Sequence, residues 1–282
     1  KWHNNAARNA GVTCVIIGVG VKTKINFLYQ GDSCQQVKVI NPYLLPSDIK
    51  VITRSVSPIS NIGKMSYGNL PGDGNHLTLN RQERDFLLEQ SPHLENLILP
   101  LYGAQEFIRG MRRYCLWIDD IDLPIAKENE FIRQRIELVY KTRFNSKDPS
   151  YNSLIDRPHQ FRDRNLAENL TILVPTISSE RRDYLPIGVY RGRTATTNQA
   201  FALYDENLWN MSILSSKLHL IWIATVCGKL KTDYRYSNTL GWNTFYVPKL
   251  TEKNMLDLTR SAEEILLARE VHFPKTISEL YN

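Results

Sequence analysis

Residues 229–236 read KLKTDYRY and place Lys229, Lys231 and Arg235 among tyrosines. An apolar predicted helix, residues 215–227, precedes this run and ends at Gly228, and a short predicted strand ended by Pro248 follows it. Cations held at the end of a buried helix suit a phosphate backbone lying over them. The alternative, to which composition gives about equal weight, is a solvated loop whose tyrosines cover the edge of the core.

A second segment combines one acidic and two basic side chains at the predicted entry to a strand. Residues 178–188 read SSERRDYLPIG, with Glu180 and Arg182 two residues apart, so both side chains can point to one side. Arginine pairs with N7 and O6 of guanine, and glutamate accepts from the amino group of cytosine. The pattern therefore predicts base recognition, with a local ion pair between Glu180 and Arg182 as the alternative.

The overall charge agrees with an anionic partner. The net charge is +6 and the pI is near 9.0, an excess that is also common in proteins of other kinds. Arginine pairs, which make forked contacts with phosphate and guanine, account for much of this excess. We expect these candidate DNA-binding residues: Lys147, Asp148, Glu180, Arg181, Arg182, Arg191, Arg193, Lys229, Lys231 and Arg235.

Motifs for catalysis or cofactor binding are incomplete. Asn41, Pro42 and Tyr43 are similar to the Asn-Pro-Pro-Tyr loop of amino-methyltransferases but lack its second proline, so we interpret them as a turn. The glycines of residues 18–21 form no GxGxxG pattern, and the sequence contains no GxSxG elbow and no HxxxH spacing. We therefore expect no catalytic, cofactor-binding or metal-binding residue in this chain.

An acidic group, Asp119, Asp120 and Asp122, follows a predicted strand. Carboxylates at this spacing are able to hold a metal ion, but no second acidic cluster of matching character accompanies them. We favour a solvated strand end over a metal site.

Apolar patterning predicts strands and helices in mixed order. A continuous run at residues 12–19 predicts a central strand, and strands at 24–29 and 36–40 should pair antiparallel with it because no crossover helix intervenes. Further strands are expected at these ranges: 49–53, 114–118, 170–174, 185–190 and 200–203.

Capping residues define the expected helices. Asn80 with Glu83 opens a helix through Gln90, Thr251 opens another through Glu270, and Thr276 with Glu279 begins a final turn. A helix over residues 124–144 carries an apolar stripe containing Ile132, Ile136, Val139, Tyr140 and Phe144. Its rim should carry the basic side chains Arg133, Arg135, Lys141 and Arg143.

Several long runs, in the same order, resemble segments of the MmeI-like DNA methyltransferases. These single-chain restriction and modification enzymes join a methyltransferase to their own target recognition domain. The resemblance covers nearly the whole chain, and runs of this length are far more specific than a short motif. The matching runs occupy residues 1–18, 60–80, 103–118, 175–190, 225–240 and 242–248.

The resemblance implies an α+β fold in three parts. Residues 1–48 would supply the last mixed or antiparallel strands of a methyltransferase sheet. Residues 49–205 would form an α/β target recognition domain, and residues 206–282 a helical C-terminal domain.

It also implies a division of labour within a longer polypeptide. This chain would bind double-stranded DNA, whereas an upstream methyltransferase domain would bind S-adenosylmethionine and methylate adenine at N6. The chain alone should be inactive, since its sequence contains neither a cofactor loop nor a complete Asn-Pro-Pro-Tyr loop. Two other classes stay open: a module that binds acidic proteins, and a small metal-dependent hydrolase or nuclease using Asp119 and its neighbours.

Cysteine usage and hydropathy bear on the compartment. Cys14, Cys34, Cys115 and Cys227 form no CxxC or zinc spacing, and three of them lie in apolar runs. No apolar run approaches the roughly 20 residues that a bilayer span needs. The sequence therefore predicts a cytoplasmic protein without a membrane partner.

Overall fold

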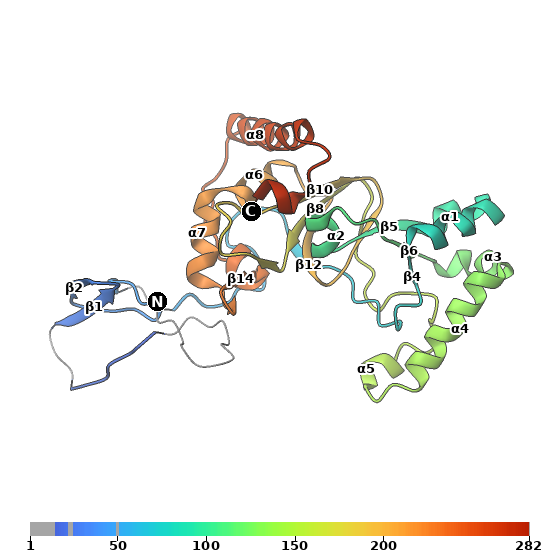
Figure 1. Cartoon of the computed structure of the whole chain (residues 1–282), viewed down its shortest axis with the longest axis horizontal. Coiled ribbons are helices and arrows are strands. Elements are labelled where there is room, and N and C mark those ends of the chain that lie inside the picture. Colours follow the sequence, from blue (N-terminus) through green and yellow to red (C-terminus); the bar gives the residue numbers. More distant parts are fainter. Residues whose placement is uncertain (1–14, 22–24, 49–50, 282) are drawn as a thin grey trace.

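The computed structural model describes residues 15–21, 25–48 and 51–281, and it confirms a mixed α+β fold (Figure 1). Most strand pairs are antiparallel. Two hydrophobic clusters are the main cores of the described part, one around a four-stranded sheet and one around a five-stranded sheet.

The N-terminal part forms a two-stranded hairpin. Strands β1 (Asn26–Gln30) and β2 (Ser33–Val37) pair antiparallel across a turn in which Gly31 has a φ of 60°. The strands predicted at 24–29 and 36–40 were expected to pair antiparallel with the run at 12–19. The antiparallel geometry is observed, but within the described residues β1 pairs with β2, and β2 ends at Val37, before most of the predicted strand at 36–40. The hairpin lies at one end of the molecule, away from both sheets (Figure 1).

The predicted strand at residues 12–19 is wrong where the structure describes it. Residues 15–20 are irregular, and Val19 and Val21 are each 93% exposed. An apolar run becomes a strand only when a neighbouring strand satisfies its backbone groups, and none does so within the described residues. The predicted strand at 49–53 is also irregular over residues 51–53. Residues 12–14, 24 and 49–50 lie outside the description.

The four-stranded sheet has the order β10-β8-β12-β3, and all its pairs are antiparallel. Its strands are β3 (Met65–Tyr67), β8 (Leu170–Pro175), β10 (Gly188–Arg191) and β12 (Ala200–Tyr204). The predicted strands at 170–174 and 200–203 are confirmed. The one expected from residue 185 begins only at Gly188, because Pro186 has no N–H to donate to a ladder.

Three helices pack on this sheet and complete its core: α6 (Trp209–Ser215), α7 (Lys217–Val226) and α8 (Glu252–Val271). Helix α8 lies across α6 at the edge of the molecule (Figure 1). Buried Trp242 donates from Nε1 to the oxygen of Gly63 at 2.7 Å, which ties the segment after α7 to the segment before β3. One core therefore contains residues from positions 65 to 262.

The five-stranded sheet has the order β4-β6-β5-β11-β7. Its strands are β4 (Thr78–Leu79), β5 (Ile98–Tyr102), β6 (Tyr114–Leu116), β7 (Leu166–Ala167) and β11 (Thr194–Thr196). The strand predicted at 114–118 is β6. The helices nearby are α1 (Arg81–Gln90), α2 (Ala104–Arg109), α3 (Leu123–Glu128), α4 (Glu130–Phe144) and α5 (Pro149–Asn152).

Predictions based on helix caps are confirmed. Asn80 and Glu83 form a capping box at α1, and Thr251 caps α8 through its side chain. Thr276 and Glu279 exchange hydrogen bonds at the start of α9 (Ile277–Tyr281). These contacts span three residues, so the local sequence contains all that they need.

The helix predicted over residues 124–144 is two helices. Asn129 leaves the helical conformation, and its side chain accepts from the N–H of Ile132 at 3.2 Å, which ends α3 and begins α4. Ile132, Ile136 and Val139 are buried as predicted. Tyr140 and Phe144 were expected on the same stripe but are exposed and stack on each other, with ring centroids 6.0 Å apart.

Two expectations for residues 215–248 are corrected. Helix α7 was expected to be buried, but only one of its faces is. Leu220 and Ile223 are buried, whereas Leu218 is 68% exposed and Ile221 is also exposed. The strand expected before Pro248 is replaced by a π-helical turn, η3 (Asn238–Trp242), followed by irregular chain. Buried Trp242 and Phe245 on this segment pack into the core from a turn instead of from a strand.

Candidate nucleic-acid interface

A three-stranded sheet joins the two segments that were predicted separately to contact DNA. It consists of β9 (Ile177–Ser178), β13 (Lys229–Leu230) and β14 (Asp233–Arg235) in the order β13-β14-β9. Tyr234 lies opposite Ser178, and Arg235 lies opposite Ile177. The segment that contains Glu180 and Arg182 therefore lies beside the basic hairpin, although more than 40 residues separate them in sequence.

The hairpin is fixed at its base by buried side chains. Helix α7 begins at its cap Ser216, and β13 follows it within three residues of Val226. His219 of α7 lies 2.9 Å through Nε2 from the hydroxyl of Tyr236, the residue directly after β14. Both side chains are buried, and burial lowers the pKa of His219 to about 3, so this imidazole is neutral. A rigid helix end therefore supports the hairpin.

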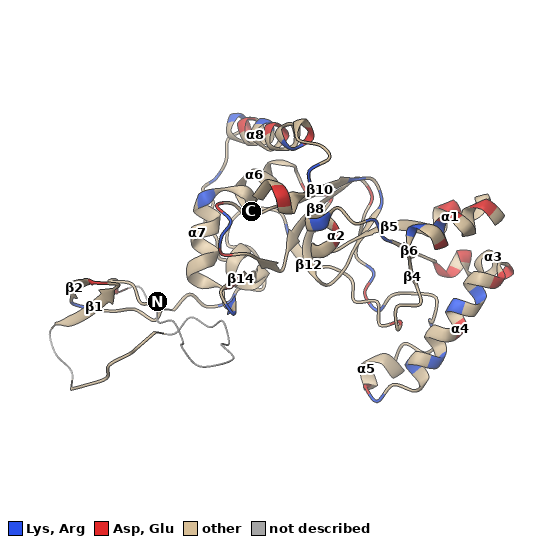
Figure 2. Ribbon diagram, viewed as in Figure 1, with Lys and Arg blue, Asp and Glu red and all other residues tan. Residues whose placement is uncertain are grey.

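The cations of the hairpin face solvent. Lys229, Lys231 and Arg235 are all exposed, and Figure 2 shows basic residues at this hairpin. Lys229 Nζ lies 3.8 Å from Glu180 Oε2 and 5.3 Å from the centre of the Tyr234 ring. Lys231 lies in the hairpin turn, at the tip, with a φ of 58°, a left-handed conformation that tight hairpin turns require. The hairpin thus presents positive charge next to the turn at residues 179–182.

Glu180 and Arg182 differ in their access to solvent. Glu180 is partly buried in the turn after β9 and pairs with Lys229. Arg182 is only 9% exposed, with Nη1 3.5 Å from Ser178 Oγ. Burial lowers the pKa of Arg182, and the nearby carboxylate of Asp233 opposes this effect. Glu180 therefore lies nearer the surface of this site than Arg182.

The other candidate residues lie elsewhere, except for exposed Arg181 in the same turn. Arg191 pairs with Leu170 at the start of β8, whereas β9 follows the other end of β8. The length of β8, about 17 Å, therefore separates Arg191 from the end of the strand that leads into β9. Arg193 Nε lies 3.6 Å from Glu168 Oε2. Lys147 and Asp148 lie between α4 and α5, where Asp148 caps α5 by accepting from the N–H of Ser150 at 2.8 Å.

The incomplete catalytic motif is a turn, as predicted. Asn41 Oδ1 accepts from the N–H groups of Tyr43 and Leu45 at 2.9 and 3.0 Å. The side-chain oxygen that would bind an amino group in the methyltransferase loop is thus satisfied within its own backbone.

The acidic group after β6 pairs with basic and amide side chains. Asp119 Oδ1 lies 2.6 Å from Arg164 Nη2. Asp120 Oδ1 lies 2.8 Å from His159 Nε2 and accepts from Gln160 Nε2 at 2.8 Å. Across the residues that the structure describes, no three His, Cys, Asp or Glu side chains are grouped to hold a metal ion.

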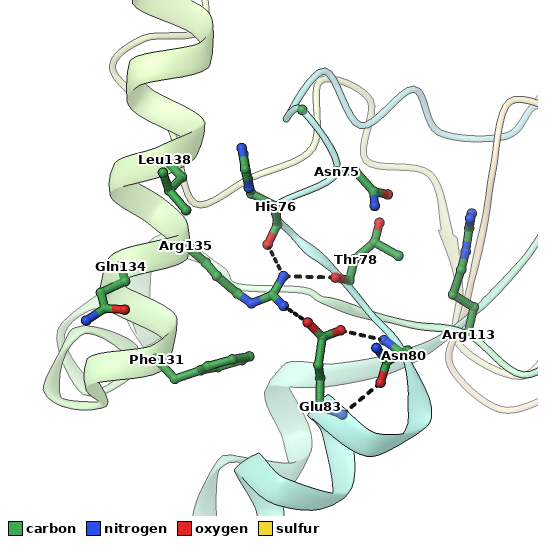
Figure 3. Close-up of a pocket in the computed structure, with 11 residues that line it drawn as sticks. Asn75, His76, Thr78, Asn80, Glu83, Arg113, Phe131, Gln134, Arg135 and Leu138 are labelled. Atoms are coloured by element: carbon green, nitrogen blue, oxygen red, sulfur yellow. Dashed lines mark hydrogen bonds and ion pairs between the residues drawn. The ribbon is translucent and has the colours of Figure 1, made fainter.

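A polar cleft of about 610 Å³ lies between α1, α4 and β4 (Figure 3). At its back, Arg135 donates to the oxygens of His76 and Thr78 at 2.8 and 3.0 Å and forms an ion pair with Glu83. The guanidinium also lies 4.5 Å from the centre of the Phe131 ring. Arg135 thus connects α4 with β4 and α1. The prediction that it lies on the rim of the helix is wrong.

Arg143 was also expected on the rim of the helix, but it is buried, with 1% of its surface exposed. Its position, four residues after Val139 on the 3.6-residue period, is on the buried stripe that begins with Ile132 and Ile136. The sequence therefore contained a signal for its burial, which the charge of the residue obscured. Sequence reasoning missed Arg143 as a residue that organises the surrounding loops.

Comparison with known proteins identifies the class. Residues 46–249 match the family model for the MmeI target recognition domain, so the chain belongs to this family. It is 37% identical, over its whole length, to DNA methyltransferase A of Bacillus subtilis (strain 168). It also matches a structure described as the Type IIL restriction-modification enzyme MmeI in complex with DNA, with a TM-score of 0.82 and 27% identity over 92% of this chain.

The matched proteins are much longer than this chain. It spans 32% of the length of DNA methyltransferase A and 35% of the MmeI chain. In the part that the structure describes, no helix is both long and apolar enough to cross a membrane.

Proposed function

We propose that this chain provides sequence-specific recognition of duplex DNA for an S-adenosylmethionine-dependent DNA methyltransferase of a restriction-modification system. The observation that supports the proposal is the pairing of β14 with β9, which brings the hairpin that carries Lys229, Lys231 and Arg235 beside the turn that carries Glu180 and Arg182. Membership of the MmeI target recognition domain family supports the same conclusion.

In this proposal the two segments have different roles. Lys229, Lys231 and Arg235 contact phosphates, because they are exposed on a hairpin with a buried base. Glu180 and Arg182 contribute to base recognition, with Glu180 at the surface and Arg182 buried beneath it. Secondary contacts come from the remaining candidates: Lys147, Asp148, Arg181, Arg191 and Arg193.

The proposed organisation is that of a longer protein. Residues 1–48 complete the sheet of an upstream methyltransferase domain, and residues 49–205 form the target recognition domain. Residues 206–282 form a helical C-terminal part that packs on the four-stranded sheet and contributes the phosphate contacts of the basic hairpin. The upstream domain holds S-adenosylmethionine and methylates adenine at N6, and this chain alone has no activity. The compartment that we propose is the cytoplasm.

The test is a selection from duplexes with a randomised central segment, carried out with the chain at several salt concentrations. We expect one short sequence to be enriched, with affinity that falls as salt rises. Equal recovery of all sequences would contradict specific recognition and leave only electrostatic binding. The longer enzyme, supplied with S-adenosylmethionine, should then methylate an adenine within the enriched sequence.

A further inference from the structure

The side chain of Arg143, at the end of α4, donates five hydrogen bonds, and every acceptor is a backbone oxygen. Nε donates to Gly72 at 2.8 Å, Nη1 to Leu154 and Arg157 at 3.0 and 2.7 Å, and Nη2 to Pro71 and Gln160 at 3.4 and 2.6 Å. A guanidinium has five N–H donors, so every donor has an acceptor. The planar fork of arginine is required for such a set, because the ammonium of lysine has three donors and no fixed plane.

These bonds connect two segments that are distant in sequence. Pro71 and Gly72 belong to the turn before β4, whereas Leu154, Arg157 and Gln160 belong to the chain between α5 and β7. Burial lowers the pKa of Arg143 to about 10, and the nearby carboxylate of Asp73 opposes this effect. The group is therefore charged at neutral pH, and the peptide dipoles around it replace its hydration.

The chain between Arg143 and Leu154 forms a loop that contains α5. The loop begins at Arg143 itself, and its far end is held by the bond from Arg143 Nη1 to the oxygen of Leu154. Lys147 and Asp148 lie within it and are exposed. Hydrogen bonds within this loop hold its shape: the N–H of Asp148 donates to Ser146 Oγ at 3.1 Å, and Asp148 Oδ1 caps α5. Tyr151 of α5 packs against Gly72, where an added Cβ would lie 2.7 Å from the ring. These contacts hold the loop in one position relative to the turn at residues 71–72.

From this geometry we infer that Arg143 is a positioning residue for DNA recognition: it holds the Lys147 and Asp148 segment (residues 145–153) at a fixed place on the DNA-binding surface. The inference rests on the proposed function, because it requires that this segment contact DNA. Arg143 itself is buried and touches no DNA in this arrangement.

The test substitutes Arg143→Lys and measures two quantities, the melting temperature and the preference for the enriched duplex over duplexes changed at one base pair. Preference at one position should fall about tenfold, while binding to random duplex at low salt is retained. Arg135→Lys is the matched control, since Arg135 is another arginine of α4 that donates to two backbone oxygens. It should lower the melting temperature without changing preference.

One double variant separates the possible failures. Lys147→Ala combined with Asp148→Ala should reduce preference at the same position as Arg143→Lys. If the double variant changes preference but Arg143→Lys does not, the positioning role is wrong and the proposed function stands. If neither changes preference, this segment does not read DNA, and the inference is overturned while the enriched sequence still supports the proposed function. A chain that enriches no sequence contradicts the proposed function itself.

Should Arg143→Lys fail to fold, Gly72→Ala makes the same test from the other side of the guanidinium. Gly72 has a φ of 60°, and a Cβ there would meet the Tyr151 ring, so this substitution displaces α5 from the turn. Loss of preference at the same base pair is expected. Unchanged preference in a folded Gly72→Ala variant would overturn the inference.

Discussion

Lys229 and Glu180 form an ion pair, with Lys229 Nζ 3.8 Å from Glu180 Oε2. The pair joins the first residue of β13 in the basic hairpin to the turn after β9, beside the backbone pairing of Tyr234 with Ser178. Both side chains retain contact with solvent, so the pair stabilises the fold by no more than about 1 kcal/mol. Its consequence is positional, because a side chain proposed to bind phosphate lies against one proposed to read a base.

Replacing Lys229 with Ala should weaken binding to every duplex alike. One phosphate contact fewer reduces the slope of log affinity against log salt by about one unit. The measurement is binding to the enriched and a scrambled duplex at several salt concentrations. Lys253→Ala, on an exposed part of α8, is the control and should leave the slope unchanged. A loss confined to the enriched duplex would show that Lys229 reads bases.

Lys231 requires a different substitution, because its φ is 58°. Lys231→Gly should reduce the salt slope by about one unit and leave the melting temperature nearly unchanged, since glycine adopts this conformation readily. Lys231→Ala should lower the slope equally but also destabilise the hairpin turn. Thermal unfolding of both variants separates the charge from the backbone strain. Equal melting temperatures of Lys231→Gly and Lys231→Ala would show that the left-handed conformation at this position does not affect stability.

Glu180→Gln should reduce affinity for the enriched duplex by about 1–3 kcal/mol and have little effect on random DNA. Arg182→Met should have the same selectivity, with an added loss of stability because Arg182 is buried. The measurement is competition between duplexes changed at single base pairs. Asp183→Asn, at an exposed neighbouring position, is the matched control. Equal losses on all duplexes would assign Glu180 and Arg182 to structural or backbone contacts.

Acid should destabilise the fold through His219. Its folded pKa, about 3, lies below the value of roughly 6.5 expected in the unfolded chain. The favourable contribution of the neutral imidazole is therefore complete above pH 6.5 and is lost as the pH falls toward 3. The expected slope from this group approaches 1.4 kcal/mol per pH unit. His219→Gln retains a partner for Tyr236 without a titrating ring, so unfolding free energies of this variant should fall less between pH 7 and 4.5. Identical pH profiles would contradict the assignment.

Removing residues 1–48 should lessen self-association and leave the melting temperature of the remainder nearly unchanged. The reason is the exposure of apolar side chains such as Val19, Val21 and Phe27, with few contacts from this segment to either sheet. Sedimentation at matched concentrations measures the association. Val19→Ser with Val21→Ser in the intact chain is the control and should act in the same direction. Unfolding of the truncated chain would place the boundary elsewhere than residue 48.

Local signals predicted much of the secondary structure. The capping boxes at Asn80 and Thr276 and the cap at Thr251 involve residues within one helical turn, so they form wherever the chain is helical. Strands β8 and β12 were predicted because six and five residues of unbroken apolar or small character leave few alternatives. The run at residues 15–20 has the same character, but it is irregular because a strand also needs a partner.

The sequence by itself determined which segments are basic, which are apolar and where most helices begin, since each of these properties depends on neighbouring residues. It also contained the long runs that resemble the family to which the chain belongs. Only the tertiary structure decided that β14 pairs with β9 and that one guanidinium, Arg143, holds two distant segments. Strand pairing and buried hydrogen bonds depend on which groups meet after the chain has closed long loops, and the many possible pairings differ little in local energy.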